Sequence, residues 1–140
     1  MKAIDLFSGA GGFSLAAHNL GINVLAAVEL DSNACKTYQK NLIEDRKQNT
    51  HVINEDILEM SPVDLLSRLS LAKGELDLLI GGPPCQGFSS HRINDAGVDD
   101  PRNKLLLRYF DFVKTLQPKV FLIEMFQGYF GSVMKLTFKS

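Results

Sequence analysis

The sequence contains no tryptophan and only two cysteines, Cys35 and Cys85, which lie fifty positions apart. Because no Cys-x-x-Cys pair occurs, a structural zinc site and a disulfide framework are both poor interpretations. Two unpaired thiols are typical of a cytosolic protein. We therefore expect no metal site.

The chain also lacks a long apolar run and an excess of charge of either sign. No hydrophobic stretch approaches the roughly 20 residues that a membrane-spanning helix needs, and Asp5 is atypical of a signal peptide. The formal net charge of −1 argues against a free-standing nucleic-acid binder, which would carry a basic face. This net charge is still compatible with a catalytic part of a protein whose DNA-binding surface lies elsewhere. We expect a cytoplasmic protein without a membrane partner.

The composition is that of an ordinary globular domain, with 45% hydrophobic and 22% charged residues. Apolar stretches and helical periodicity alternate along the chain, without internal repeats. The expected strands are residues 2–7, 22–30, 51–54, 76–80 and 120–123, and the expected helices are residues 13–20, 32–42, 63–71 and 104–116. This alternation is typical of βαβ units, so we predict an α/β fold with a parallel sheet.

One rigid turn stands out at the end of the fourth expected strand. Two glycines and two prolines, residues 81–84, precede Cys85. Glycine allows close backbone approach and proline fixes the chain direction, so the turn is stiff. A thiol held on such a turn is a candidate nucleophile. A small buried hydrophobe is the alternative for Cys85, and the turn alone leaves both open.

Four other features also follow the ends of expected strands: the loop at residues 8–12, Glu29, Asp56 and Glu124. The carboxyl ends of parallel strands meet at one edge of a sheet, where α/β proteins bind ligands. All of these features, together with Cys85, are therefore expected to line one edge.

The spacing of these features favours an adenosine-containing ligand. An acidic residue about twenty positions after a glycine-rich loop commonly binds ribose hydroxyls, which suits Glu29, and Asp56 could accept a hydrogen bond from an adenine amino group. The alternatives are a tight turn for the loop at residues 8–12, a solvated carboxylate for Glu29 and a helix cap for Asp56. Ser14 stands where a dinucleotide fingerprint has its third glycine, and no Walker lysine follows. S-adenosylmethionine fits better than a dinucleotide.

Two segments resemble motifs of the DNA (cytosine-5) methyltransferases. Residues 5–14, Asp-Leu-Phe-Ser-Gly-Ala-Gly-Gly-Phe-Ser, resemble the first motif of that family, and residues 82–89, Gly-Pro-Pro-Cys-Gln-Gly-Phe-Ser, resemble its highly specific Pro-Pro-Cys motif. Glu29, Asp56 and residues 102–105 match further motifs in the right order. The resemblance implies a three-layer Rossmann-like S-adenosylmethionine-dependent methyltransferase fold. Its parallel sheet would have about five strands, with helices on both faces.

The resemblance also implies the cofactor, its product S-adenosylhomocysteine, and the residues around both ligands. The residues implied for the cofactor are Asp5, Phe7, Ser8, Gly9, Ala10, Gly11, Gly12, Glu29, Leu30, Asp56, Ile57, Pro83 and Leu105. The residues implied for double-stranded DNA are Pro84, Gln86, Ser89, Ser90 and Arg92.

The implied chemistry is methyl transfer to C5 of a cytosine in DNA. Cys85 would attack C6 of a cytosine flipped out of the duplex, and Glu124 would contact the N3 edge of the ring. Residues 91–103 would close over the base. His91 could in principle be a base for Cys85, but the family uses none there, and we interpret it as a loop residue.

The sequence departs from the family after Glu124, where Met125 and Phe126 replace the Asn-Val of the family motif. We expect residues 1–124 to form the cofactor-binding catalytic domain and residues 125–140 to be a tail unlike the family. We expect the fold to be truncated relative to the family and the target-recognition domain to be absent.

Truncation would have structural consequences along the strand at residues 120–123. Its outer edge, and helix faces that include Leu106, Tyr109 and Phe110, would be left bare. Self-association, or a second chain that carries the recognition domain, would then cover them. The alternative is that the tail folds back over the edge.

Two functions compete at this point. One is a DNA (cytosine-5)-methyltransferase of restriction-modification type in the prokaryotic cytosol. The other is a non-catalytic remnant or split subunit that binds only S-adenosylmethionine or a partner chain. A nicotinamide-dependent oxidoreductase leaves the Pro-Pro-Cys motif unexplained.

Overall fold

The computed structural model describes residues 1–84, 104–127 and 130–136, with side chains up to residue 124. Within these residues six strands form one sheet in the order β3-β2-β1-β4-β5-β6. The strands are β1 (Lys2–Leu6), β2 (Asn23–Glu29), β3 (His51–Asn54), β4 (Leu78–Gly81), β5 (Val120–Gln127) and β6 (Phe130–Leu136). The helices are α1 (Gly12–Asn19), α2 (Ser32–Tyr38), the π-helix η1 (Gln39–Glu44), α3 (Pro62–Arg68) and α4 (Lys104–Leu116).

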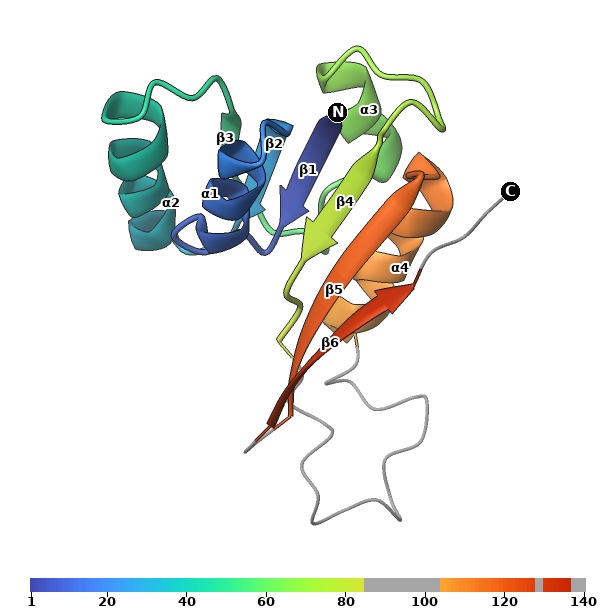
Figure 1. The fold of residues 1–140 in the computed structure, drawn as a ribbon. Coiled ribbons are helices and arrows are strands. Elements are labelled where there is room, and N and C mark those ends of the chain that lie inside the picture. The colour runs from blue at the N-terminus through green and yellow to red at the C-terminus, as the bar shows by residue number, and fades with distance from the viewer. Residues whose placement is uncertain (85–103, 128–129, 137–140) are drawn as a thin grey trace.

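Strands β1 to β5 are parallel, as the sequence predicts (Figure 1). β1 lies at the centre of this set, where Ile4 pairs with Ala26 of β2 and with Leu79 of β4. Because the five strands share one direction, their carboxyl ends lie at the same edge of the sheet.

Helices cover both faces of the sheet, which makes the predicted three layers (Figure 1). On one face, α3 and α4 pack Leu65, Tyr109 and Phe112 against the strands in the largest buried cluster. On the other face, α1 packs against β2 and β4, while Tyr38 of α2 and Leu42 of η1 pack against β2.

Two helices begin at short polar side chains that cap their N-termini. The Asp31 side chain accepts hydrogen bonds from the backbone N–H groups of Asn33 and Ala34, at 2.7 and 3.0 Å. The Ser61 hydroxyl accepts from the backbone of Asp64 at 3.3 Å, and Pro62 occupies the first helical position. Such caps satisfy the amide groups that a helix N-terminus leaves unpaired.

The outer edge of β5 is covered by the chain itself, so the expectation of a bare edge there is wrong. β6 pairs antiparallel with β5 from Phe121↔Leu136 to Gln127↔Phe130. The sequence shows no clear period after residue 124, and only the alternative of a tail that folds back foresees this pairing.

The expected exposure of α4 also needs correction. Tyr109 is fully buried, and its hydroxyl donates a hydrogen bond shared between the carbonyls of Leu79 and Leu122, at 3.2 and 3.0 Å. Burial raises the pKa of this hydroxyl. Leu106 is half-buried, and Phe110 is 37% exposed. α4 therefore turns Tyr109 into the sheet and leaves Leu107 and part of Phe110 exposed.

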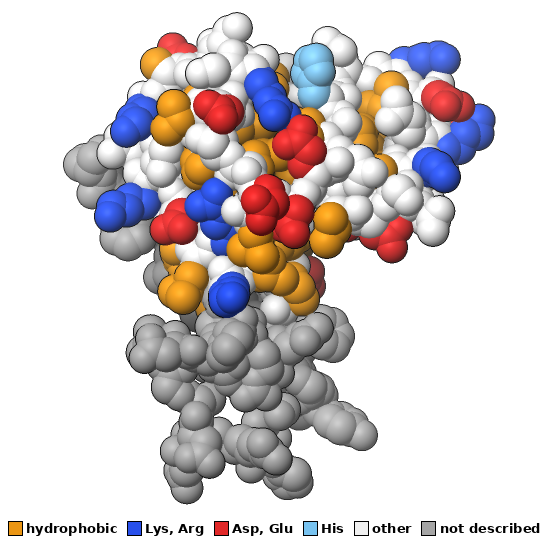
Figure 2. Space-filling view, turned by 180° about the vertical axis from the view of Figure 1, so that it is seen from behind, with side chains coloured by type: hydrophobic (Ala, Val, Ile, Leu, Met, Phe, Trp, Pro, Cys, Tyr) orange, Lys and Arg blue, Asp and Glu red, His pale blue; other side chains and the backbone are white. Residues whose placement is uncertain are grey.

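Charged side chains of both signs are interspersed on the face that carries α3 and α4 (Figure 2). This mixture is compatible with the near-zero net charge of the chain. In the part of the chain that the structure describes, no helix combines the length and the apolar character needed to cross a membrane.

Candidate functional site

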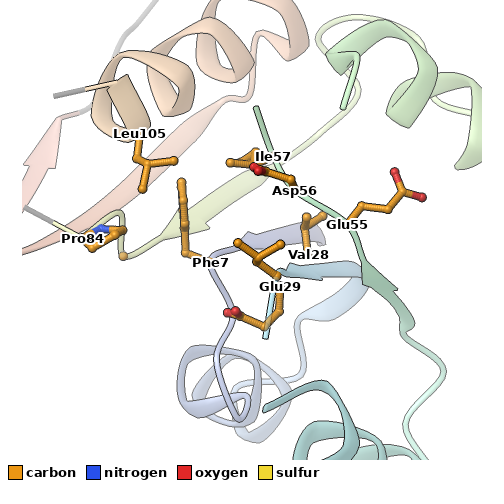
Figure 3. Close-up of a pocket in the computed structure, with 10 residues that line it drawn as sticks. Phe7, Val28, Glu29, Glu55, Asp56, Ile57, Pro84 and Leu105 are labelled. Carbon is orange, nitrogen blue, oxygen red and sulfur yellow. The ribbon is translucent and has the colours of Figure 1, made fainter. Parts of the chain in front are cut away.

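A cavity of about 270 Å³ opens at the carboxyl ends of the parallel strands (Figure 3). Its lining residues are Phe7, Val28, Glu29, Leu30, Glu55, Asp56, Ile57, Gly82, Pro84 and Leu105. The structure thus brings together six residues that the sequence predicts for a cofactor, from three different strand ends and α4. Pro84, predicted for DNA, lies in the same wall.

Phe7 holds an unusual backbone conformation at the entrance to the glycine loop. Its φ of 59° is in the left-handed region, which aromatic residues seldom adopt. The chain is held there because the Ser8 N–H donates to the Val28 carbonyl at 3.1 Å and the Gly11 N–H donates to the Ser8 carbonyl at 2.9 Å. The Phe7 ring points toward Leu105 and Ile57 (Figure 3). Such strain is found where structure serves a site.

Glu29 lies at the end of β2, and both oxygens of its carboxylate accept backbone hydrogen bonds. Oε2 accepts from the Gly9 N–H and Oε1 accepts from the Asp31 N–H, each at 2.8 Å. The carboxylate therefore connects the glycine loop to the turn before α2. Each oxygen keeps a second lone pair that can accept from a ligand.

Asp56 organises the turn that follows β3. Its Oδ1 accepts from the Leu58 N–H at 2.9 Å, while its carbonyl accepts from Glu59 and Met60 at 3.0 and 3.2 Å. Asp56 thus caps this turn and also lines the cavity. The sequence leaves two interpretations open for Asp56, a contact to an adenine amino group and a cap, and this geometry is compatible with both.

Glu55 contributes less to the cavity than its neighbour does. Its carboxylate accepts a hydrogen bond from Arg68 at 2.6 Å and points away from Phe7, Pro84 and Leu105 (Figure 3). Sequence reasoning missed Glu55, Val28 and Gly82. Glu55 and Gly82 both follow the ends of expected strands, and this position could have indicated them.

Asp5, predicted for the cofactor, lies within the core. It is fully buried, and its Oδ2 accepts a hydrogen bond from the Ser14 hydroxyl at 2.7 Å. Burial raises the pKa of Asp5 to about 7. Its side chain is not among the residues that line the cavity. Through its hydrogen bond with Ser14, Asp5 instead connects β1 to α1, the helix that follows the glycine loop.

The rest of the predicted glycine loop lies apart from this cavity. Ala10, Gly11 and Gly12 line a second hollow of about 480 Å³ together with residues of η1. Ser8 and Pro83 are buried, and neither lines the cavity that contains Glu29. Gly9 contributes through its N–H bond to Glu29.

Of the two predicted catalytic residues, only Glu124 falls within the described chain. A Cβ atom added to Gly82 would lie 3.9 Å from Glu124 Oε2, which places this carboxylate beside the start of the Pro-Pro turn. Cys85, Gln86, Ser89, Ser90, His91 and Arg92 lie outside the described residues. In the part that is described, no group of three His, Cys, Asp or Glu side chains is placed to hold a metal ion.

The strand order, the cavity at the strand ends and the motif residues around it define an α/β ligand-binding domain of methyltransferase type. The family model for the C-5 cytosine-specific DNA methylases matches residues 1–139 of the sequence. The chain therefore belongs to the C-5 cytosine-specific DNA methylase family.

Curated relatives of bacterial origin agree with this assignment. The chain is 42% identical over 122 residues to the Type II methyltransferase M1.HphI of Haemophilus parahaemolyticus, covering 86% of this chain and 31% of that protein. It is 39% identical over 127 residues to the Type II methyltransferase M.AquIA of Picosynechococcus, covering 91% of this chain and 49% of that protein. The chain thus spans 31% and 49% of the length of these two relatives.

Solved structures share the fold. A protein described as a DNA modification methyltransferase, encoded within an E. coli prophage, is 36% identical and has a TM-score of 0.73, with 91% of this chain and 32% of that chain covered. A variant of Spodoptera frugiperda DNMT2 is 25% identical, with a TM-score of 0.63 over 91% of this chain and 36% of that chain. The predicted Rossmann-like methyltransferase fold is therefore confirmed.

Proposed function

We propose that this chain is the S-adenosylmethionine-binding catalytic part of a DNA (cytosine-5)-methyltransferase of restriction-modification type. The observation that carries the proposal is the cavity in which Phe7, Glu29, Asp56 and Leu105 converge beside the turn that leads into Cys85. Membership of the C-5 cytosine-specific DNA methylase family supports this interpretation.

The residues around the cavity suit the two ends of an adenosine group. The apolar side chains of Phe7, Ile57 and Leu105 can enclose a flat base between them. Asp56 offers a carboxylate to the adenine amino group, and Glu29 offers its remaining lone pairs to the ribose hydroxyls. When bound, S-adenosylmethionine supplies an electrophilic methyl group.

The residues of the chain would prepare the cytosine for that methyl group. The Cys85 thiolate forms a bond to C6 of the flipped base, which places electron density at C5. Glu124 contacts the N3 edge and stabilises the charge that develops there. After transfer, a base takes the C5 proton, and the electrons of the C5–H bond expel the Cys85 thiolate from C6 and restore the aromatic ring.

The partners follow from this chemistry. The substrate is double-stranded DNA, and a second chain or a second copy could supply contacts to it. The bacterial sources of the curated relatives support a place in the prokaryotic cytosol.

Covalent trapping tests the function directly. A pool of duplexes with 5-fluorocytosine at randomised sequence contexts is incubated with the chain and S-adenosylmethionine, because the fluorine blocks the final elimination. We expect a denaturant-resistant adduct with the unaltered chain and none with Cys85→Ser. Cys35→Ser is the matched control, since Cys35 is buried and its thiol donates to the Glu29 carbonyl at 3.5 Å.

The outcomes separate the two functions. An adduct that persists in Cys85→Ser would show that another residue is the nucleophile. S-adenosylhomocysteine binding without any adduct would favour the alternative, a protein that binds the cofactor without catalysis.

A further inference from the structure

We propose that Arg108 is a positioning residue for the cofactor cavity, through a clamp on the turn that carries Asp56 and Ile57. This inference rests on the proposed cofactor function. Arg108 lies on α4, one turn after Leu105, and outside the segments that resemble the family motifs.

The guanidinium of Arg108 reaches across to two backbone carbonyls of the turn after β3. Nε donates to the Ile57 carbonyl at 2.9 Å, and Nη2 donates to the Met60 carbonyl. The guanidinium presents several donors in a planar fork, which lets it hold both carbonyls at once. Arg108 therefore sets the position of this turn relative to α4.

The surroundings of Arg108 hold its side chain in place. The guanidinium carbon lies 5.3 Å from the centre of the buried Phe112 ring, a distance suited to a cation–π contact. Nη1 lies 3.5 Å from Asp111 Oδ2, and the Arg108 side chain is only 22% exposed. A charge with this little solvent around it keeps its hydrogen bonds in a fixed geometry.

The clamp connects two walls of the cavity. Leu105 forms one wall, and Asp56 and Ile57 form another. Since Arg108 joins α4 to the Asp56 turn, it fixes the distance between these walls without lining the cavity itself. Loss of the clamp should let the turn move while the core stays folded.

The structural part of the inference is tested without any ligand. Hydrogen exchange is measured at the Glu59 and Met60 amides, which donate to the Asp56 carbonyl. We expect Arg108→Met to lose protection at these two amides, whereas the control Lys114→Met, an exposed position on the same helix, keeps it. Unchanged protection in Arg108→Met would overturn the clamp.

The functional part is tested by titration calorimetry with S-adenosylhomocysteine. We expect Arg108→Met to bind about tenfold more weakly, Arg108→Lys to recover part of the loss because it can reach one carbonyl, and Lys114→Met to bind normally. Equal affinities in Arg108→Met and Lys114→Met would contradict the proposal.

A double-mutant cycle separates positioning from a general loss of stability. If Arg108 acts through the turn, Arg108→Met and Asp56→Asn should be non-additive in affinity, while Arg108→Met and Glu29→Gln should add. Additive effects in both cycles would overturn the proposal. Failure of the unaltered chain to bind the probe would count against the proposed function, and the clamp would then stand or fall on hydrogen exchange alone.

Discussion

Replacement of Glu29 by glutamine tests how one carboxylate serves both the loop and the ligand. Glu29 accepts backbone bonds from Gly9 and Asp31, each at 2.8 Å. Glutamine keeps one acceptor oxygen but turns an N–H₂ group toward the other backbone N–H. One charge-assisted bond is then lost, which is worth about 1.5–3 kcal/mol. Because Glu29 is half-exposed, we expect the lower end of this range.

The expected loss can be measured in two ways. A decrease of about 1.5 kcal/mol should lower the melting temperature of a chain of this size by about 3–6 °C. The affinity for S-adenosylhomocysteine should fall by about tenfold, since both the loop and the ribose contact are altered. Thermal melts measure the first effect and titration calorimetry measures the second.

Glu75→Gln is the matched control. The exposed Glu75 accepts from the Ala72 N–H at 2.9 Å, but it precedes β4 and so lies at the opposite edge of the sheet from the cavity. We expect this variant to keep the affinity of the unaltered chain. Unchanged affinity and stability in Glu29→Gln would refute the role assigned to Glu29.

Three further predictions concern the core. Burial raises the pKa of Asp5 from 3.8 to about 7, so the folded state binds an extra proton and loses stability as the pH rises between these values; Asp5→Asn should flatten this slope in thermal melts, and an unchanged slope would contradict it. Tyr109→Phe should cost about 1–3 kcal/mol in urea unfolding, because two buried carbonyls lose their donor, and a loss below about 0.5 kcal/mol would argue against that bond. Gly11→Ala places a Cβ 2.6 Å from Leu42 at a φ of 96°, whereas the Cβ of Gly21→Ala meets nothing within 4 Å. Gly11→Ala should therefore lower the free energy of unfolding in urea more than Gly21→Ala does. Equal losses of free energy would contradict this steric argument, because η1 would then have moved to make room.

Local signals were enough to predict most of the sheet and its helices. Asp31 and Ser61 mark the beginnings of α2 and α3 through short polar side chains that cap free amides. Alternation of apolar stretches with helical periodicity predicts the parallel strands, and the parallel direction then gathers Glu29 and Asp56 at one edge. These features depend on residues close in sequence.

Features that depend on distant contacts could not be predicted in this way. Tyr109 fits under the sheet because Gly81 leaves room for it, and a Cβ at Gly81 would lie 2.5 Å from the Tyr109 ring. The pairing of β6 with β5 depends on backbone groups and leaves no period in the sequence. Asp5 was expected at the cofactor, but it lies within β1 and its side chain turns toward α1, where it bonds the Ser14 hydroxyl.

The candidate site was predicted in its residues but not in its geometry. The motif residues indicate which side chains meet, yet the two backbone bonds of Glu29 and the left-handed φ of Phe7 arise only once the strands are paired. The clamp of Arg108 on the Asp56 turn joins residues about fifty positions apart and has no local signal.

Titration calorimetry of the unaltered chain with S-adenosylhomocysteine tests the central claim most directly, with NAD as the competing ligand. The account predicts that S-adenosylhomocysteine binds at one site per chain, that Asp56→Ala and Glu29→Ala each weaken this binding, and that NAD gives no heat of binding. Tight binding of NAD with none for S-adenosylhomocysteine would contradict the account.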